Sequence, residues 1–443
     1  MASARYSALL LAALIAADTR PAAAQRDTAT LEPVVVTVTR GRGQTILRSP
    51  FALSVVSADS ARPGLRHAGA EEMLLGIPGL ASSSRNNPSQ DPRLSIRGFG
   101  TRSAFGVRGV RMMRDGIPLT LPDGQTPLDY MSLESIGRIE VMRGSASALY
   151  GNATGGVIDV QTIEPFGGPV AVEGRQWIGA DRYLRSVIAG SGTSGRLSFV
   201  ADATRSSSDG TREHSRQRSA LWFSRIGHSD GQGEIALTLL ALDNPLSQNP
   251  GALTLEEMRA DPRAADPGSV RRRARKAVRQ LQLGLSAERN AGPGRLAASV
   301  FGGSRSLDNP LAFAVVEIGR HTWGGGASMT SGPARHRISA GVDFQSQNDL
   351  RRNYFACADT VPQTAPTTRC PRPGSDRGAV TLDQREIVTS AGAYVSDEIA
   401  FSGSISATAG VRADHVGFRV RDRMLSASNP DDSGERSLRA VSP

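Results

Sequence analysis

Beyond Pro165 the chain repeats one pattern, in which a segment of alternating polar and apolar residues is followed by a break rich in Gly, Asp, Ser or Asn. Alternation with a period of two is typical of a strand whose two faces meet different surroundings. About a dozen strand candidates follow this pattern, at residues 170–178, 183–189, 196–203, 219–226, 234–242, 278–285, 295–301, 325–329, 337–342, 387–395, 405–411 and 416–420. Their even spacing predicts a β-sandwich, a barrel or a solenoid.

The links between these segments favour one of the three architectures. Short links such as 191–195 and 402–403 alternate with long ones such as 243–276 and 345–384. Short turns at one rim and long loops at the other are typical of outer-membrane barrels, and arginines that recur within the strands fit a wet interior. Beyond the N-terminus the sequence has no apolar run of about 18 residues, the length that a helical membrane span needs. We therefore expect residues 165–443 to form part of an antiparallel transmembrane β-barrel.

The preceding segment, residues 45–164, has no such regular alternation. Short apolar strand candidates are separated by glycine-rich turns, at residues 51–56, 110–114, 138–143 and 155–160. A short helix candidate at 68–75 is stopped by the Gly and Pro residues that follow it. This pattern predicts a compact α+β domain in front of the barrel.

The N-terminus has the features of an export signal followed by a polar segment. Residues 1–24 combine a positive start at Arg5, a short apolar core and an Ala-Ala-Ala cleavage site, as in a secretory signal peptide. Residues 25–44 then form a polar segment that contains a Val- and Thr-rich run at 31–39, a composition with high strand propensity. Such a run is either an unpaired strand offered to a partner's sheet edge or the first strand of the next domain. The residues alone leave both readings open.

The formal net charge of +10 changes this picture little. Of the 52 basic residues, Lys276 is the only lysine, a skew that reflects genome composition more readily than a function. No basic run is interleaved with stacking aromatic residues, so a nucleic-acid partner is not predicted.

The two cysteines, Cys357 and Cys370, lie in a polar segment rich in Pro and Thr. Their spacing suits a disulfide that closes a loop, provided that the compartment is oxidising. A metal site would need further ligands nearby, and this segment contains no histidine.

Signs of enzyme chemistry are weak throughout the chain. The histidines show no metal-ligand spacing. Gly98, Gly100 and Gly106 lie in no βαβ unit, as a dinucleotide site would require, and the serines near Tyr150 lack the frame of a nucleophile elbow. We therefore expect no catalysis, no metal site and no cofactor.

Three charged residues of the α+β domain, Arg97, Glu140 and Arg143, stand in strand contexts. An isolated buried charge is costly, so each should be paired or lie in water. A polar plug inside a polar barrel would supply the partners. We expect these residues to lock the domain in place rather than to bind a ligand.

Loops are the more favourable places for ligand contacts, because binding residues concentrate in loops on a rigid scaffold. Arg102 would bind a carboxylate or phosphate in a bidentate manner, and Phe105 would stack on a planar ligand. The full set of candidate ligand-binding residues is Arg85, Asn86, Arg102, Phe105, Asp123, Gln125 and Asn249. Ordinary solvent-facing loops are an equally weighted alternative.

Four motifs together make the chain resemble the TonB-dependent outer-membrane receptors. They are SIRGFG at Ser95–Gly100, MRDGIPL at Met113–Leu119, RIEVMRG at Arg138–Gly144 and ALYGNATGGVIDV at Ala148–Val160. The resemblance extends to the signal peptide, to the run at 31–39, which is similar to a TonB box, and to the barrel pattern. Within the family the chain looks closest to siderophore-type receptors and to the branch that imports pyrroloquinoline quinone.

This resemblance implies a plug domain lodged in a Gram-negative outer-membrane barrel of about 22 strands. It implies energised import of a scarce small molecule, with TonB and its ExbB/ExbD complex as partners and outer-membrane lipid around the barrel. The residues that couple to TonB would be Glu32, Val34, Val35, Val36, Thr37 and Val38.

The number of strand candidates departs from this family pattern, because it is about half of what a closed barrel needs. An open wall would leave unpaired strand edges in lipid. We therefore expect a truncated receptor or a fragment, one that does not transport on its own. A structural or adhesive surface β protein is the alternative from another class; it predicts a residue repeat after Pro165, where only strand periodicity is visible.

Overall fold

A computed structural model describes residues 35–38, 44–46, 49–57, 69–83, 87–101, 103, 106–332, 335–357, 369–370, 375–402, 405–426 and 429–443. The chain divides between Val34 and Val35 into two units, and every described residue belongs to the second. The expected signal peptide and the coupling residues Glu32 and Val34 lie outside the described residues.

The plug is built on a five-stranded sheet with the strand order β3-β8-β9-β6-β7. β6 and β9 run parallel, and the other neighbours are antiparallel. These strands are β3 (Ala52–Ser57), β6 (Val110–Arg114), β7 (Ile117–Pro118), β8 (Ile136–Arg143) and β9 (Gly156–Thr162). Two hairpin-like pairs and two short helices complete the plug: β1 (Val35–Val36) with β2 (Gln44–Thr45), β4 (Leu80–Ser83) with β5 (Arg93–Ile96), η3 (Ala70–Leu74) and α2 (Ser147–Tyr150). The expected α+β architecture is confirmed.

The central strand β8 is buried on both of its faces. Ile139 and Val141 point into a core that also includes Phe223, a residue of the long antiparallel sheet that we call the wall. Met142, on the opposite face, packs in a second core with Val38 of the N-terminal segment. One face of the plug sheet therefore lies on the wall, and the other lies under the N-terminal segment.

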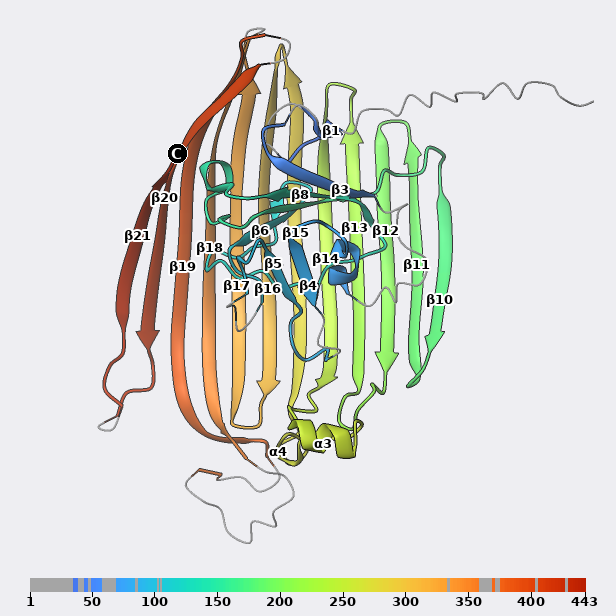
Figure 1. Ribbon diagram of the computed structural model, residues 1–443, viewed down its shortest axis with the longest axis vertical. Coiled ribbons are helices and arrows are strands. Elements are labelled where there is room, and N and C mark those ends of the chain that lie inside the picture. The colour runs from blue at the N-terminus through green and yellow to red at the C-terminus, as the bar shows by residue number, and fades with distance from the viewer. Residues whose placement is uncertain are drawn as a thin grey trace, which may run out of the picture. The chain divides into compact units, whose positions relative to one another are not determined.

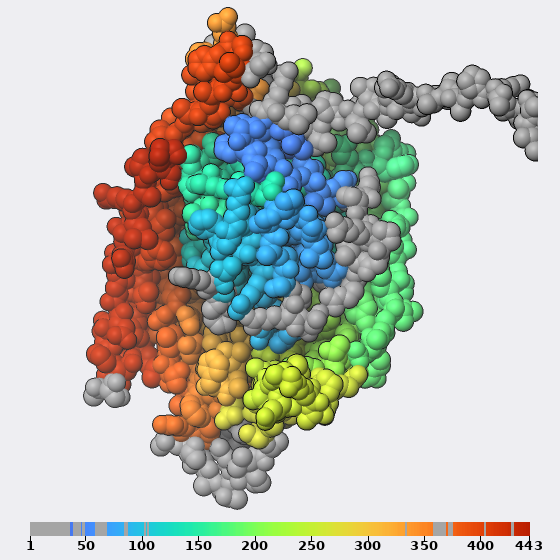
Figure 2. Space-filling model, viewed as in Figure 1, coloured from blue at the N-terminus to red at the C-terminus, as the bar shows by residue number. Residues whose placement is uncertain are grey.

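The wall is a single antiparallel sheet of twelve strands in sequence order, β10 to β21. Its strands are β10 (Ala171–Gly179), β11 (Tyr183–Ser194), β12 (Leu197–Ser208), β13 (Gln217–Ser229), β14 (Gly233–Gln248), β15 (Arg275–Ala291), β16 (Gly294–Pro310), β17 (Ala314–Ser331), β18 (His336–Ala356), β19 (Arg377–Ala400), β20 (Ser406–Asp422) and β21 (Gly434–Ser442). Among the described residues the sheet is not closed, because β10 and β21 each pair on one side alone. Figure 1 shows the plug strands crossing this sheet, and Figure 2 shows the plug in view between β10–β11 and β19–β21.

The strand pattern is confirmed, but the strands are longer than the alternation predicted. The candidates 405–411 and 416–420 are one strand, β20. Residues 243–248, expected in a loop, continue β14. β21 was not foreseen at all.

The links define two rims of the wall. The first, which we call the short-turn rim, carries the links 195–196, 230–232, 292–293, 332–335 and 401–405. The long-loop rim carries the links 180–182, 209–216, 249–274, 311–313, 357–376 and 423–433. α3 (Leu255–Ala260) and α4 (Pro267–Arg271) belong to the link 249–274.

The two faces of the wall differ in chemistry. Large apolar side chains such as Ile188, Trp222 and Leu283 are exposed on one face. The alternate positions turn toward the plug and include polar residues such as Arg185 and Asp202 beside apolar ones such as Phe223. Of the described helices, none combines the length and apolarity that a membrane span requires.

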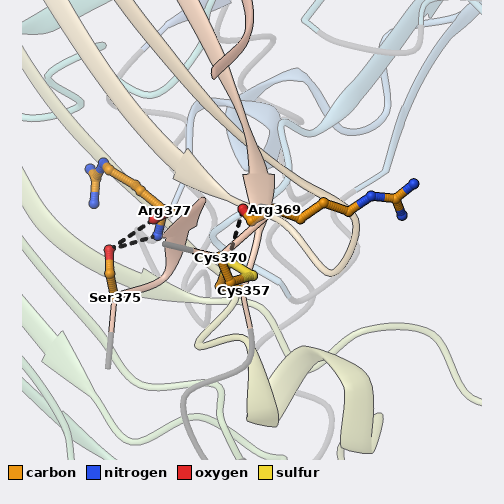
Figure 3. Close-up of a disulfide and its surroundings, with 5 residues drawn as sticks. All are labelled: Cys357, Arg369, Cys370, Ser375 and Arg377. Carbon is orange, nitrogen blue, oxygen red and sulfur yellow. Dashed lines mark hydrogen bonds between the residues drawn. A yellow bond between two sulfur atoms is a disulfide. The ribbon is translucent and has the colours of Figure 1, made fainter. Parts of the chain in front are cut away.

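A disulfide joins Cys357 and Cys370 in the long link between β18 and β19, with 2.00 Å between the sulfur atoms. Figure 3 shows this bond beside Arg369, whose carbonyl oxygen lies 3.8 Å from Cys357 Sγ. The Arg369 carbonyl also accepts the Ala379 N–H at 2.8 Å. The bridge thus ties the link to the start of β19.

Candidate functional site

The described part of the TonB-box-like segment is docked on the plug near the short-turn rim. The N–H groups of Thr37 and Val38 both donate to Glu140 Oε2 at 2.8 Å. Glu140 is fully buried, and Arg138 lies 3.0 Å from its other oxygen. Since a carboxylate that accepts several N–H groups forms strong hydrogen bonds, Glu140 fixes this segment firmly.

Tyr150, at the end of α2, supplies a second contact to the docked segment. Its hydroxyl donates to the Val38 carbonyl at 2.7 Å. The preceding carbonyl, of Leu149, accepts from Nη1 of the wall residue Arg412 at 3.4 Å. Arg412 is buried and is also paired with Asp343 at 2.8 Å. The short helix α2 therefore touches both the docked segment and the wall.

A cavity of about 310 Å³ separates the plug from the wall at this rim. Thr37 and Asp159 line it from the plug, and Glu234 and Arg295 line it from the strand ends beside short turns. Asp159 Oδ1 is buried and has no hydrogen-bond partner among the described residues. Burial, with a smaller contribution from the charge of Glu140, raises the pKa of Asp159 well above its usual value. Asp159 and Glu140 face each other on β9 and β8, so ionising Asp159 sets two carboxylates side by side.

Nearer the long-loop rim the plug is held to the wall by charges. Lys276 Nζ lies 2.6 Å from Asp91 and 3.2 Å from Asp129. Arg305 binds the same Asp129 with both terminal nitrogens, at 3.0 and 2.7 Å. We call Asp91, Asp129, Lys276 and Arg305 the ionic cluster. Its side chains are between 8 and 17% exposed, so solvent screens these pairs only weakly.

The electrostatics of Asp129 follow from this position. Burial alone would raise its pKa, but the attraction of Arg305 and Lys276 outweighs burial and holds the pKa of Asp129 below its usual range. Two further contacts between plug and wall are nearby: Arg185 with Glu134 at 2.8 Å and Ser132 with Asp202 at 2.6 Å.

A larger cavity, of about 620 Å³, lies beside this cluster. Asp91 and Asp129 line it from the plug, and β12, β13 and β14 add mostly hydroxyl and amide groups: Thr204, Ser206, Ser208, Gln217, Ser219, Asn244 and Ser247. Asp91 also accepts the N–H of Gly106 at 3.0 Å. One carboxylate thus connects the cavity, the ionic cluster and the loop that contains the candidate ligand residues Arg102 and Phe105.

Of the candidate ligand-binding residues, Arg85, Asn86, Arg102 and Phe105 lie outside the described residues. Asn249 accepts a hydrogen bond from Asn87, a cavity residue, at 3.0 Å. Asp123 and Gln125 lie together in one tight loop, where the Gln125 N–H donates to Asp123 Oδ1 at 2.9 Å. Neither of these two lines the large cavity.

The three expected locking residues lie in different surroundings. Glu140 is held by groups of the plug and the docked segment. Arg143 donates to the plug carbonyls of Pro78, at 2.6 Å, and Leu53, at 3.4 Å. Arg97 is exposed, with a left-handed φ of 49°. Glu140 and Arg143 are thus partnered by groups of the plug and of the docked segment, and the locking role of the three residues stays a prediction.

The reading of residues 35–38 as an unpaired, free strand is also corrected. Val35–Val36 pairs with Gln44–Thr45, and Val36 and Val38 are fully buried. Although it is paired, the segment does not belong to the five-stranded sheet of the plug. The residues that hold plug to wall were missed, although the solitary lysine among so many arginines was a signal for one of them.

The geometry can be compared with known proteins. Residues 45–157 match the family model of the TonB-dependent receptor plug domain. A hemin receptor of Yersinia enterocolitica is 32% identical over 170 residues, which cover 36% of this chain and 23% of that receptor. The hemin receptor of Yersinia pestis is 31% identical over 170 residues, or 24% of its length. The matches therefore span about a quarter of these curated relatives.

Solved structures share the fold at low identity. The unliganded ferric citrate transporter FecA superposes with a TM-score of 0.68 at 20% identity, over 88% of this chain and 59% of that one. The ferric yersiniabactin uptake receptor FyuA from Yersinia pestis gives 0.67 at 18% identity, over 88% and 61%. The matched proteins are named as receptors and transporters, not as enzymes. Residues 45–157 thus belong to the TonB-dependent receptor plug domain family, and the antiparallel wall that follows shares its fold with the solved structures.

Proposed function

We propose that this chain is the plug and part of the barrel of an outer-membrane receptor that imports a scarce small molecule, most simply an iron chelate. The wall stands in the outer membrane with its apolar face toward lipid, and the plug closes the passage. TonB, energised by ExbB/ExbD, pairs with the segment 31–39 and remodels the plug. No step changes the cargo chemically.

The observation that carries this proposal is the separation of two sites on one plug. The docked segment lies near the short-turn rim, beside the cavity that contains Thr37. The larger cavity lies toward the long-loop rim, where Asn87 meets Asn249. A receptor that takes cargo on one side of a membrane and is driven from the other needs such an arrangement.

Iron chelates are the cargo class that the comparisons favour. The relatives are named hemin receptors, and the structural neighbours are named for ferric citrate and ferric yersiniabactin. The hydroxyl and amide groups that β12, β13 and β14 present to the large cavity suit a ligand rich in oxygen atoms. No described histidine lines this cavity, so the described residues favour an intact chelate over iron ligation by imidazole. Pyrroloquinoline quinone stays a second candidate on the sequence resemblance alone.

The test is deletion of residues 32–39 from the receptor gene in its native host. We expect growth on the cognate iron source to be lost, while binding of that chelate to the cells is retained. Hemin, ferric citrate and other ferric chelates are supplied singly as the sole iron source, and radioactive iron distinguishes binding from uptake. A deletion of equal length in the link 357–376 serves as the control. Undiminished uptake without residues 32–39 would contradict the coupling role.

A further inference from the structure

The wall has a groove of about 330 Å³ on the face that turns away from the plug. Ser304 and Ser306 of β16 are exposed on this face and form its floor. Arg279 on β15 is opposite Ser306, and His321 on β17 is opposite Ser304, so these two longer side chains form the sides. None of the plug residues that the structure describes lines this hollow, which we call the outer groove.

The pattern of β15 places the outer groove at one edge of an apolar band. Leu281, Leu283 and Leu285 are exposed on the outer face, and the exposed Arg279 and Arg289 lie at the two ends of this run. Ten residues separate the two arginines, which is about 33 Å along a strand and about 25 Å across a membrane at the usual strand tilt. The apolar band of an outer-membrane barrel is about 25 Å tall. Arg279 therefore lies at the level of lipid head groups, on the long-loop side.

Two exposed tryptophans mark the same level. Trp323 is two residues from His321 on β17, and its ring lies 5.1 Å from that of Phe344, measured between centroids. Trp222 on β13 is in the same register row as Leu281. Tryptophan is enriched where lipid meets water, and aromatic girdles border the apolar band of barrels. The aromatic residues thus agree with the position of the arginines.

The polar groups of the outer groove suit an anion. The Arg279 side chain is 78% exposed, and its Nε binds Asp243 Oδ1 at 3.1 Å. Its two terminal nitrogens have no partner in the part of the chain that the structure describes. Asp243 therefore orients the guanidinium and leaves a two-pronged donor open, a geometry that matches phosphate. His321 and the two serine hydroxyls add further donors.

We propose that the outer groove binds the phosphate of an outer-leaflet lipid, with Arg279 as the main phosphate ligand and an acyl chain along Leu281 and Leu283. The proposal rests on the function proposed above in one respect, namely that the wall stands in the outer membrane. The lipid lies on the opposite face of the wall from the plug and the cargo. It fills the hollow over Ser304 and Ser306 that the side chains of the wall leave open.

Titration of the purified full chain in nonionic detergent micelles tests the site. The probe is bisphosphorylated lipid A, and native mass spectrometry counts the lipids that stay bound. The same lipid without its phosphates and inorganic phosphate alone are the comparison probes. We expect the phosphorylated lipid to bind more strongly than either of them, because the site takes both the phosphate and the acyl chain.

Arg279→Met should lower the affinity for the phosphorylated lipid about tenfold or more, because charge-assisted hydrogen bonds are lost. The variant should fold as the wild type does, since an exposed ion pair contributes little to stability. Arg289→Met is the matched control: Arg289 is 64% exposed and pairs with Asp230 at 3.2 Å, at the opposite edge of the apolar band and outside the groove. It should leave the affinity unchanged.

Ser304→Phe tests the hollow without altering a charge. The ring fills the floor of the groove, so the affinity for the phosphorylated lipid should fall about as far as in Arg279→Met. Unchanged affinity in Ser304→Phe would overturn the groove as the site. Equal losses in Arg279→Met and Arg289→Met would overturn it too, because they would show unspecific attraction between charges. Binding of the dephosphorylated lipid or of inorganic phosphate as strong as that of the phosphorylated lipid would also contradict a lipid phosphate site.

The result is independent of import, because the titration contains neither cargo nor TonB. Lipid binding that depends on Arg279, together with a receptor that fails to take up any iron chelate in its host, would keep the outer groove and contradict the proposed function. Intact uptake together with no lipid binding to the wild type would overturn the groove and leave the proposed function standing.

Discussion

The two ends of the plug are held in different ways. At the long-loop side, Asp91 and Asp129 of the plug bind Lys276 and Arg305 of the wall. At the short-turn side, the docked segment is bound by Glu140 and Tyr150, which belong to the plug itself. The difference means that releasing the segment breaks no ion pair with the wall. Displacing the plug, in contrast, requires separation of the ionic cluster.

The two ends also respond oppositely to pH. The pKa of Asp129 is lowered, so its contribution to stability is present above its unfolded value near 3.8 and is lost as pH falls through the folded value. The pKa of Asp159 is raised from the same value, so its contribution is complete at low pH and is lost as pH rises through the folded pKa. Acid therefore weakens the ionic cluster, whereas rising pH destabilises the plug at Asp159, beside Glu140.

The largest effect should come from Lys276→Met, which leaves Asp91 without the cation at 2.6 Å. Removing one partner of a buried ion pair typically costs about 3–5 kcal/mol, and the partial exposure of this cluster places the expected loss near the lower bound. Denaturant unfolding, followed by proteolytic release of the plug, measures it. Arg279→Met on the same strand is the control: Arg279 and Asp243 are 78 and 54% exposed, and such pairs contribute about 0–1 kcal/mol.

The double variant Lys276→Met with Asp91→Asn sharpens this test. It removes both the cation and the charge left behind, so part of the lost stability should return. If the double variant is as unstable as Lys276→Met alone, packing of the lysine stem and not charge explains the loss.

The next effect concerns cargo binding at the long-loop side. Arg102→Ala together with Phe105→Ala should weaken chelate binding about tenfold, because a bidentate donor and a stacking surface are lost. Isothermal calorimetry measures the affinity, and Tyr150→Phe, at the other end, should leave it unchanged. An unaltered affinity in the double variant would remove this loop from the site.

The last expected effect, a gain and not a loss, is that of Asp159→Asn. The neutral amide cannot ionise beside Glu140, so plug stability should no longer fall as pH rises above about 4. Each pKa unit by which Asp159 is raised corresponds to about 1.4 kcal/mol gained by the variant at high pH. Unfolding midpoints at pH 5 and pH 8 test this, with Asp123→Asn as the control. Parallel pH profiles for wild type and Asp159→Asn would show that Asp159 is ionised throughout.

Much of the fold followed from local sequence, whereas the contacts of the site did not. Alternation identified most wall strands because each has one apolar and one polar face. It missed β21, where GERSLRAVS offers little apolar alternation. It predicted the strand β8 but not what covers its faces: Glu140 meets residues that are 102 and 103 positions away in the chain.

The ionic cluster was hidden for the same reason. Lys276 lies 185 residues from Asp91, and Arg305 lies 176 from Asp129. No periodicity links residues at such separations, because their pairing depends on how the plug sits on the wall. The solitary lysine was noticed and assigned to composition. In the structure, the compact Lys276 ammonium reaches two carboxylates at once, those of Asp91 and Asp129.

That solitary lysine also makes the protein unusually simple to interrogate by amine chemistry. In residues 1–443 an amine-directed crosslinker can attach to the N-terminus and to one side chain, Lys276. Every internal crosslink to a plug carboxylate would therefore share one origin on β15. Linkers of increasing length attached at this one residue would measure how far the plug can move from β15.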